Sequence, residues 1–418
     1  MRTLAIVGSG PAGFYTAEAA LKTFGSDCRI DLLDRLPTPY GLIRAGVAPD
    51  HQSIKAVSRR YDQVAEDARV RFLGDVEVGR DVSIAELLDI YDDVVLATGA
   101  PEDRPLGIPG DTLPGVLGSA AFVGWYNGHP DWADLRPPLD CAAVAVIGNG
   151  NVAIDCARVL AKTADELAAS DIVSHALDTL RLAPTQMIHL VGRRGPHQAS
   201  FTLKEVGELG ELDRATPVVD AADFPPAEAD AAIETGRRRV VEVLRRFASE
   251  GPRADRPIRI CFDFFRRPVR VIGAGRVEAL EVMRTRLDAD GNAIDTGETQ
   301  VIPCGMVISA IGYRSNPVPG APFDTRLGRF VNNDGLIAPR LWCVGWARRG
   351  PSGTIGTNRQ DGFKLVERIA TSPVTDRRAG PPALHALLKH KGVRALSFDA
   401  WKRIDAAEVA RARAGAPR

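Results

Sequence analysis

Short runs of consecutive apolar residues, each followed by a glycine-containing turn, recur along the chain. They include Leu4 to Val7, Val94 to Leu96, Val144 to Ile147 and Met306 to Ile308. Runs of this length between turn residues are typical of strands that are buried on both faces of a parallel sheet. The pattern predicts an α/β protein with mostly parallel sheets.

Two of these runs lead into glycine fingerprints of the same form. The first is Gly8-Ser9-Gly10-Pro11-Ala12-Gly13, and the second is Gly148-Asn149-Gly150-Asn151-Val152-Ala153. The glycines permit a sharp turn close to a pyrophosphate, the last small residue lets a helix pack on a strand, and the helix start offers free N–H groups to the anion. One such motif is a weak signal. Two of them predict two Rossmann-like dinucleotide-binding domains, one for a flavin and one for a nicotinamide.

The residue that ends the next apolar run distinguishes the two sites. Ile30 to Leu33 is followed by Asp34, about 20 residues after the last glycine, where the fingerprint places a ribose-binding acid. A carboxylate at this point accepts hydrogen bonds from ribose hydroxyls and repels a 2′-phosphate. The first site is therefore predicted to hold FAD or NAD rather than NADP.

The corresponding run of the second site ends differently. Met187 to Val191 leads to Gly192, Arg193 and Arg194, with no acid. Paired guanidinium groups suit a phosphate dianion because they keep their charge and present fixed forks of donors. Ala153 fits the GxGxxA variant of the fingerprint. The second site is predicted to hold NADP(H), and the alternative is that the two arginines form a solvated basic turn.

A stretch rich in proline and glycine, Pro101 to Pro114, indicates a domain boundary near residue 103. A later buried run, Arg340 to Trp346, is interpreted as a strand that returns to complete the first sheet. We therefore expect the second domain to be inserted into the first. The predicted parts are an FAD-binding domain at residues 1–103 and 333–418 and an NADP-binding domain at residues 104–332.

Three segments of the insert have patterns of their own. Ala164 to Arg181 is polar and rich in alanine, which predicts a helix. Ile258 to Met283 alternates apolar and charged residues, which predicts antiparallel strands. Val301 to Gly312 contains another buried run and is expected to close the second domain.

Composition narrows the class of protein further. The 418 residues are 45% hydrophobic and 25% charged, which is ordinary for a globular protein of two or three domains. Lys+Arg and Asp+Glu both number 53, so no bulk attraction to nucleic acid or membrane is predicted. The 6 cysteines form no CxxC or CxxxxC pair, which disfavours a redox dithiol, an iron-sulfur centre or a zinc site. Because the first strand begins close to Met1 and no stretch is long enough for a membrane span, we expect a cytoplasmic protein.

A basic strip is predicted on one helix. Arg237, Arg238 and Arg239, followed by Arg245 and Arg246, recur at helical spacing among valines and a leucine. Such a strip attracts an acidic protein and speeds its encounter, although a run of charge is more often a solvated face.

Longer blocks of sequence carry a resemblance to a known family. Pro39 to His51 reads PYGLIRAGVAPDH, Gly192 to Leu209 reads GRRGPHQASFTLKEVGEL, and Gly345 to Asn358 reads GWARRGPSGTIGTN. With Gly150 to Asp155 and the tail around Trp401, these blocks resemble the adrenodoxin reductase type of ferredoxin-NADP reductase over nearly the whole chain. The resemblance implies a flavoprotein that takes hydride from NADPH onto FAD and passes single electrons to a small [2Fe-2S] ferredoxin, feeding an oxygenase or cytochrome P450-type system.

The resemblance also implies which residues contact the cofactors. Besides the first glycine loop, the residues implied for FAD are Ala12, Asp34, Leu42, Val78, Gly345, Trp346, Gly353, Thr354 and Ile355. Family members often have glutamate at the position of Asp34, so a different geometry at the ribose is expected here. The residues implied for NADP are Asn149, Gly150, Asn151, Val152, Arg193, Arg194 and Glu205.

Three polar residues, His51, Asp155 and Glu208, are implied to lie where the nicotinamide meets the flavin. A histidine beside a carboxylate can relay protons at neutral pH, while the hydride transfer itself depends mainly on geometry. The alternatives are that His51 only forms hydrogen bonds in a domain interface and that Asp155 only binds loop N–H groups. By the same resemblance the basic strip becomes the ferredoxin-docking surface. Its candidates are Arg238, Arg239, Arg245 and Arg246, and further ones are Arg266, Arg267, Arg348 and Arg349.

Two other functions stay open. One is a flavoprotein subunit of a larger redox complex, such as the small subunit of glutamate synthase, but that protein has a cysteine-rich cluster-binding region and this sequence has none. The other is a sensor that binds FAD and NADP without turnover, and fast NADPH-dependent reduction of a dye would argue against it.

Overall fold

The computed structural model describes residues 1–374 and 377–418, and two six-stranded sheets organise them. The first sheet uses both ends of the chain. Its strand order is β18 (Leu336–Ala338), β19 (Leu341–Cys343), β4 (Asp93–Leu96), β1 (Arg2–Val7), β2 (Cys28–Leu33) and β3 (Val70–Leu73). Only the β18–β19 pair is antiparallel.

Helices cover both faces of the first sheet. One face, which includes Leu4 and Ile6, is packed by α1 (Pro11–Phe24), α4 (Ser58–Ala65), α12 (Ile355–Thr371) and α14 (Phe398–Ala410). The opposite face, which includes Ala5 and Val7, is packed by α5 (Ile84–Ile90) and α13 (Pro381–His390). Because neighbouring side chains of a strand point to opposite faces, a strand covered on both faces reads as an uninterrupted apolar run.

The second sheet is wholly parallel. Its order is β6 (Val116–Gly118), β14 (Met306–Ser309), β7 (Ala143–Ile147), β8 (Met187–Val191), β10 (Ile258–Asp263) and β9 (Ala215–Val219). One face packs on α6 (Ser119–Tyr126), α7 (Asn151–Ala161), α8 (Ser174–Leu182), α9 (Leu203–Glu208) and α10 (Thr235–Glu250). The other is covered by the antiparallel strands β11 (Arg266–Ile272), β12 (Ala279–Leu287) and β13 (Ala293–Pro303).

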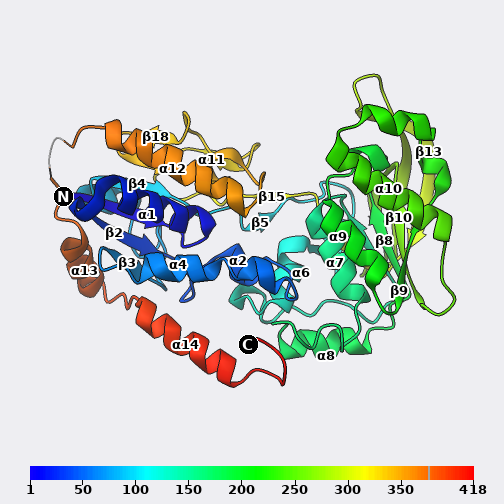
Figure 1. Ribbon diagram of the computed structural model, residues 1–418, viewed down its shortest axis with the longest axis horizontal. Helices are drawn as coiled ribbons and strands as arrows, with labels where there is room; N and C mark the ends of the chain where they lie inside the picture. The colour runs from blue at the N-terminus through cyan, green and yellow to red at the C-terminus, as the bar shows by residue number, and fades with distance from the viewer. Residues whose placement is uncertain (375–376) are drawn as a thin grey trace.

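The second sheet is inserted into the first along the chain. All its strands lie between residues 116 and 309, after β4 and before β18. The chain leaves through β5 (Glu102–Asp103) and returns through β15 (Tyr313–Arg314), which pair antiparallel, and a short hairpin of β16 (Phe323–Asp324) and β17 (Arg329–Phe330) follows. Figure 1 shows the two sheets side by side, with α14 running from the first toward the second. The inserted α/β architecture is confirmed, and the boundaries at residues 103 and 332 stay predictions.

Several local expectations can be compared with the strands. Arg340 to Trp346 contains β19, which pairs parallel with β4, so this expectation is confirmed. Val301 to Gly312 does supply β14 to the second sheet, but its first residues belong to β13. The prediction of antiparallel strands over Ile258 to Met283 is wrong for β10, which pairs parallel with β8 on one side and with β9 on the other. Its alternate apolar residues are buried, and that pattern alone does not distinguish the two strand directions.

The prediction of a helix over Ala164 to Arg181 is wrong for the first half of that segment. The helix α8 begins only at Ser174, and turns precede it. The backbone there is used for contacts with another part of the chain, since Asp171 N donates to Pro49 O at 3.1 Å. A propensity for helix is overridden where the N–H groups have such partners.

Two further features concern composition. In the stretches that the structure describes, no helix is both long enough and apolar enough to cross a membrane. All 6 cysteines are free thiols, four of them buried and two half-buried.

Candidate active site

The first glycine loop connects β1 to α1 and leaves almost no room for side chains. Gly8 has a φ of 109°, and a Cβ on it would lie 2.4 Å from Ala97 O. A Cβ on Gly13 would lie 1.9 Å from Gly8 O, so only glycine allows α1 to approach this closely. A Cβ on Gly10 would meet nothing nearer than Gly41 Cα, at 3.9 Å. This open side adjoins the uncapped start of α1 and fits a pyrophosphate.

Asp34 follows β2 and binds the glycine loop itself. Its Oδ2 accepts hydrogen bonds from Ser9 N at 2.9 Å and from Ser9 Oγ at 2.5 Å, and its Oδ1 accepts one from Leu36 N at 3.0 Å. A carboxylate offers about four lone-pair sites, so capacity for a ribose hydroxyl is left. The structure places the predicted acid at the predicted loop and gives it a second task, which is to hold that loop in shape.

Leu42 and Val78 lie on two segments that run beside this loop. Leu42 begins α2 (Leu42–Ala45), and the residue two positions earlier, Tyr40, donates from its backbone N to Ser9 O at 2.9 Å. Val78 is half-buried next to a stretch whose Val76 N donates to the backbone O of Asp34 at 2.9 Å. Both predicted residues are therefore close to the proposed nucleotide cradle.

The C-terminal part of the chain supplies the remaining residues predicted for FAD. Gly345 precedes α11 (Trp346–Arg349), and a Cβ on it would lie 2.6 Å from Ala12 Cβ, so it touches the glycine loop. The Trp346 ring stacks on Tyr313 with centroids 6.1 Å apart. Gly353, Thr354 and Ile355 form the start of α12, which packs along α1.

The second glycine loop has the same construction. Gly148 has a φ of 142°, and a Cβ on it would lie 2.4 Å from Ala310 O. The side chain of Asn149 lies against Gly192, and its Oδ1 is buried without a hydrogen-bond partner among the described residues. Gly150 precedes α7 at the N-cap position, and no side chain caps this helix start. An unpartnered buried acceptor beside an open helix start fits a ligand that brings its own donors and its own negative charge.

Asn151 and Val152 are the first residues of α7 and lie beside α9. Asn151 Oδ1 accepts a hydrogen bond from Thr202 N at 2.8 Å, which ties the two helix starts together. Glu205 on α9 is 8% exposed, and its Oε2 has no partner within the described part of the chain. A buried carboxylate oxygen is costly without a donor, so this arrangement fits a hydroxyl of a nucleotide ribose.

Arg193 and Arg194 follow β8 on an exposed turn. Their backbones are anchored, since Arg193 O accepts from Thr285 Oγ1 at 2.8 Å and Arg194 O accepts from Phe265 N at 3.3 Å. Over residues 1–374 and 377–418, neither guanidinium forms an intramolecular hydrogen bond or ion pair. Two cations on a fixed backbone, with their donors free, fit a 2′-phosphate.

The three residues predicted to be catalytic come from separate segments and meet in one cluster. His51 Nε2 lies 3.0 Å from Glu208 Oε2, and His51 Nδ1 lies 4.0 Å from Asp155 Oδ1. His51 is 6% exposed and belongs to the first unit, whereas Asp155 on α7 and Glu208 on α9 belong to the insert. The structure brings the three together, and their roles stay predictions.

A buried arginine that was not predicted from the sequence lies inside this cluster. The Arg158 side chain is 1% exposed, and it donates from Nη1 to Asp50 Oδ2 and, at 2.8 Å, from Nη2 to Asp155 Oδ1. Lys162 Nζ binds the same Asp50 oxygen at 2.7 Å. Signals for both were present, because Asp50 adjoins His51 and Arg158 lies one helical turn after Asp155.

Burial and charge act against each other on the carboxylates of this cluster. Burial favours a higher pKa for Asp50, but the charges of Arg158 and Lys162 outweigh it and hold that pKa well below its usual range. For Asp155, burial prevails over the attraction of Arg158 and raises the pKa above its usual value. For Arg158, burial is outweighed by the charges of Asp50 and Asp155, which raise the pKa, so the guanidinium stays charged.

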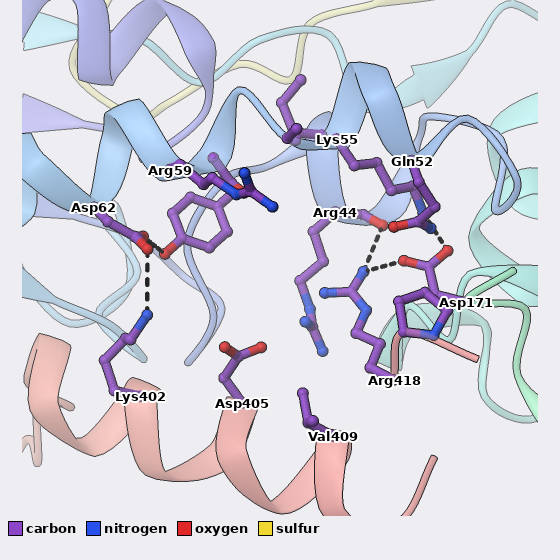
Figure 2. A pocket seen from close by; sticks show the side chains of 15 residues that line it. Arg44, Gln52, Lys55, Arg59, Asp62, Asp171, Lys402, Asp405, Val409 and Arg418 are labelled. Atoms are coloured by element: carbon purple, nitrogen blue, oxygen red, sulfur yellow. Dashed lines mark hydrogen bonds and ion pairs between the residues drawn. The ribbon is translucent and has the colours of Figure 1, made fainter. Parts of the chain in front are cut away.

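A separate cavity of about 390 Å³ lies between α3 (Gln52–Lys55), α4 and α14 (Figure 2). None of the predicted site residues lines it. Figure 2 shows Lys55 and Arg418 pointing toward Asp171, and their ion pairs measure 2.6 Å and 2.9 Å. Because Asp171 belongs to the insert, these pairs connect the two units.

Lys55 predicts a pH dependence of stability. Burial lowers its pKa to about 8 although Asp171 opposes this, whereas an unfolded lysine titrates near pH 10.4. Between these values the unfolded chain holds the proton and the folded chain has lost it, so stability rises with pH. Relative to Lys55→Met, the free energy of unfolding should increase by about 2 to 3 kcal/mol from about pH 7.5 to about pH 10. Urea titrations across this range check it, and a pH-independent difference between the two proteins would contradict it.

Comparison with known proteins shows that the chain is similar to NADPH-dependent reductases. The family model described as pyridine nucleotide-disulphide oxidoreductase matches residues 2–191. The NADPH:adrenodoxin oxidoreductase of Homo sapiens mitochondria is 41% identical over 438 residues, covering 99% of this chain and 89% of the relative. The NADPH-ferredoxin reductase FprA of Mycobacterium tuberculosis is 43% identical over 378 residues, covering 88% of this chain and 83% of the relative.

The solved structure of M. tuberculosis FprA in complex with NADPH is similar throughout. Its TM-score is 0.94 at 40% identity, with 100% of this chain and 96% of that chain covered. Likeness of sequence and of structure therefore extends over both sheets and both glycine loops. The chain belongs to the family of NADPH:adrenodoxin oxidoreductases and NADPH-ferredoxin reductases.

Proposed function

We propose that this chain is an NADPH-dependent flavoprotein reductase whose electron acceptor is a small [2Fe-2S] ferredoxin. FAD, when bound, can accept two electrons together as a hydride and give them off one at a time. One observation carries the proposal: His51, Asp155 and Glu208 join the unit of the first glycine loop to the helices beside the second. The names of two relatives, which pair NADPH with adrenodoxin or ferredoxin, support the same electron path.

The residues around the first loop would hold FAD. Gly8, Gly10 and Gly13 leave the open cradle at the start of α1 for the pyrophosphate, and Asp34 retains acceptor capacity for the ribose. The flavin ring would lie beside two later segments of the chain. These are Gly345 with Trp346, and Gly353 with Thr354 and Ile355.

The residues around the second loop would hold NADP(H). Asn149 and Glu205 each present a buried oxygen that lacks a donor in the described chain, and Arg193 and Arg194 present free guanidinium groups. A ribose and a 2′-phosphate satisfy these groups. Without the phosphate the two arginines have nothing of opposite charge to bind, so the site favours NADPH over NADH.

His51, Asp155 and Glu208 would lie where the nicotinamide meets the flavin. Their role there is to orient the reacting groups and to exclude water, and not to supply a strong acid. Hydride transfer depends on placing the donor and acceptor atoms in line and close together, and such positioning can contribute about 7 to 11 kcal/mol. His51, which is 6% exposed, and Arg158, which is 1% exposed, keep this corner dry. His51 and Glu208 can hold a proton between Nε2 and Oε2 there.

The basic strip on α10 is proposed as the docking surface for the ferredoxin. Two of its arginines have other partners: Arg238 donates to Asp230 O at 3.1 Å, and Arg245 binds the Asp230 carboxylate at 2.7 Å and 2.9 Å. Arg239 is exposed, and the Arg246 side chain is 56% exposed with Glu250 no nearer than 3.8 Å. Among the four candidates we therefore assign the docking charge to Arg239 and Arg246 and a structural role to Arg238 and Arg245.

Removing the charges of Arg239 and Arg246 should weaken docking. The double variant Arg239→Gln/Arg246→Gln is expected to raise the KM for a [2Fe-2S] acceptor about 10-fold at low ionic strength. The increase should shrink in high salt because the interaction is screened. Steady-state assays at two salt concentrations check this. Arg181→Gln/Arg276→Gln, which removes the same charge from exposed side chains elsewhere, serves as the control, and an equal effect of both pairs would refute a local docking site.

An anaerobic titration of the purified protein tests the first half of the proposed path. NADPH should bleach the flavin absorbance with one equivalent, and NADH should need a far higher concentration. A flavin that stays oxidised with both nucleotides would refute the reductase and favour a sensor without turnover. Delivery to an oxygenase or cytochrome P450-type system, and a location in the cytoplasm, stay predictions of the sequence.

A further inference from the structure

Nε2 of His51 has two neighbours of opposite hydrogen-bonding character. Arg158 Nη2 lies 3.1 Å from it, and Glu208 Oε2 lies 3.0 Å from it. A guanidinium only donates, and an ionised carboxylate only accepts. The ring nitrogen cannot serve both at once, because it either carries a proton or presents a lone pair. The two neighbours therefore correspond to two protonation states of one atom.

We propose that Arg158 is a positioning residue that lets His51 lose or regain its Nε2 proton without turning its ring. The inference rests on the proposed function, in which His51 lies where the nicotinamide meets the flavin. With Nε2 protonated, its N–H donates to Glu208 Oε2. With the proton gone, the lone pair on Nε2 accepts from Arg158 Nη2. The ring keeps a hydrogen bond at the same nitrogen in both states, so nothing drives it to rotate.

The proton has a defined route in this arrangement. The N–H bond at Nε2 breaks as an O–H bond forms at Glu208 Oε2, so that the imidazolium becomes a neutral imidazole protonated at Nδ1. Glu208, whose side chain is 25% exposed, then releases the proton to water and is an ionised carboxylate again. One proton moves and no electrons do. Nδ1 keeps its proton throughout and faces Asp155 Oδ1 at 4.0 Å.

Arg158 is held in place on several sides, which this role requires. Nη1 binds Asp50 Oδ2 and Nη2 binds Asp155 Oδ1 at 2.8 Å, while Nε lies 3.3 Å from Glu208 Oε2 as an ion pair without a hydrogen bond. Asp50 precedes His51 in the chain, so the same guanidinium anchors the segment that carries the histidine. A planar fork of donors can make these contacts at once, and an ammonium group cannot.

The charges around His51 nearly balance in both of its protonation states. Asp50, Asp155 and Glu208 contribute three negative charges, and Arg158, Lys162 and Lys204 contribute three positive ones. A neutral imidazole leaves the sum at zero, and an imidazolium makes it plus one. Neither state places a large uncompensated charge in this buried corner, as a site that exchanges a proton needs.

Nitrogen NMR of labelled histidine tests the inference without any turnover. The protein has 7 histidines, so loss of one signal in His51→Gln assigns the resonances. In the wild type the neutral ring of His51 should carry its proton on Nδ1. In Arg158→Lys and Arg158→Gln it should carry the proton on Nε2, donating to Glu208. A wild-type ring protonated on Nε2, or variants that keep the wild-type tautomer, would overturn the proposal.

Stopped-flow reduction at saturating NADPH supplies the second readout. In both Arg158 variants the limiting rate of flavin bleaching should fall about 10-fold to 100-fold, because the loss of positioning acts on the reaction step. The apparent Kd for NADPH should stay within about 2-fold. Arg214→Gln is the matched control, since that side chain caps the end of the same helix through Ala161 O and Lys162 O and does not touch His51.

The outcomes separate the possible roles. A purely structural Arg158 predicts lower thermal stability with an unchanged limiting rate and unchanged tautomer. Arg158→Gln leaves Asp50 and Asp155 without their shared partner, so if it does not fold, Arg158→Lys decides because it keeps the charge and lacks the fork. If NADPH fails to reduce the wild type, the proposed function falls, while the NMR result still decides the hydrogen-bonding role of Arg158.

Discussion

Replacing Arg193 and Arg194 together by alanine should raise the KM for NADPH on the order of 100-fold or more and leave the KM for NADH within about 2-fold. A hydrogen bond to a charged group contributes about 1.5 to 3 kcal/mol, and 1.4 kcal/mol corresponds to a factor of ten. Two such contacts to the 2′-phosphate therefore account for at least two factors of ten. Neither guanidinium has an intramolecular partner over the described residues, so no compensating contact is lost.

NADH serves as the control for this pair of substitutions. It lacks the 2′-phosphate and presents the same nicotinamide, so any damage to the fold or to the flavin site affects both nucleotides. Steady-state kinetics with a dye as acceptor measure both constants on the same preparation. An equal rise in the two KM values would contradict the assignment of these arginines to the 2′-phosphate.

Gly13→Ala should yield a protein that folds but is purified without flavin. The added Cβ would lie 1.9 Å from Gly8 O and 3.1 Å from Gly8 C, and both are backbone atoms that cannot swing aside. Either α1 moves away from the loop or the loop changes shape, and each removes the cradle for the pyrophosphate. We expect flavin occupancy below about one tenth of the wild type, measured by absorbance after denaturation.

Gly207→Ala is the matched control for this substitution. It also adds a methyl group within a helix, but its Cβ would meet nothing within 4 Å, so flavin content should be unchanged. Circular dichroism and retained binding of NADP⁺ show that Gly13→Ala is folded, because the second glycine loop is separate. A yellow, fully loaded Gly13→Ala protein would show that the close packing of α1 on Gly8 is not needed for the cofactor.

The elements that the sequence predicts well are those with local signals. The two glycine loops, Asp34 and the pair Arg193 and Arg194 follow directly from what a strand, a turn and a helix start require, and the structure places each where the pattern indicates. The returning strand at Leu341 was also predictable, because a run of apolar residues before a glycine turn is typical of a strand covered on both faces.

Elements whose structure depends on partners far away in the chain could not be predicted from the sequence. The parallel pairing of β10 is set by β8 and β9 on either side, and the alternation of Ile258, Ile260 and Phe262 with polar residues is equally typical of an antiparallel strand. From the sequence alone, Arg158 is expected to be an ordinary arginine on a helix. Only the fold shows that it is 1% exposed, because its partner Asp50 is 108 residues away in the chain.

The resemblance and the structure differ in what they contribute to the site. His51, Asp155 and Glu208 were grouped by resemblance alone, since no spacing connects residues 51, 155 and 208. The distances of 3.0 Å and 4.0 Å from His51 give that group a physical basis. In the basic strip the structure distinguishes two kinds of arginine. Arg238 and Arg245 already bind Asp230, whereas Arg239 and Arg246 can contact a partner protein.

The most direct test of the proposed path follows electrons from nucleotide to cluster. The purified protein is mixed anaerobically with one equivalent of NADPH and then with an excess of oxidised [2Fe-2S] ferredoxin, while flavin and cluster absorbance are recorded separately. Because NADPH supplies two electrons and each cluster accepts one, two clusters should be reduced per NADPH as the flavin returns to its oxidised colour. A flavin that bleaches with NADPH and leaves the cluster oxidised would contradict the assignment of ferredoxin as the acceptor.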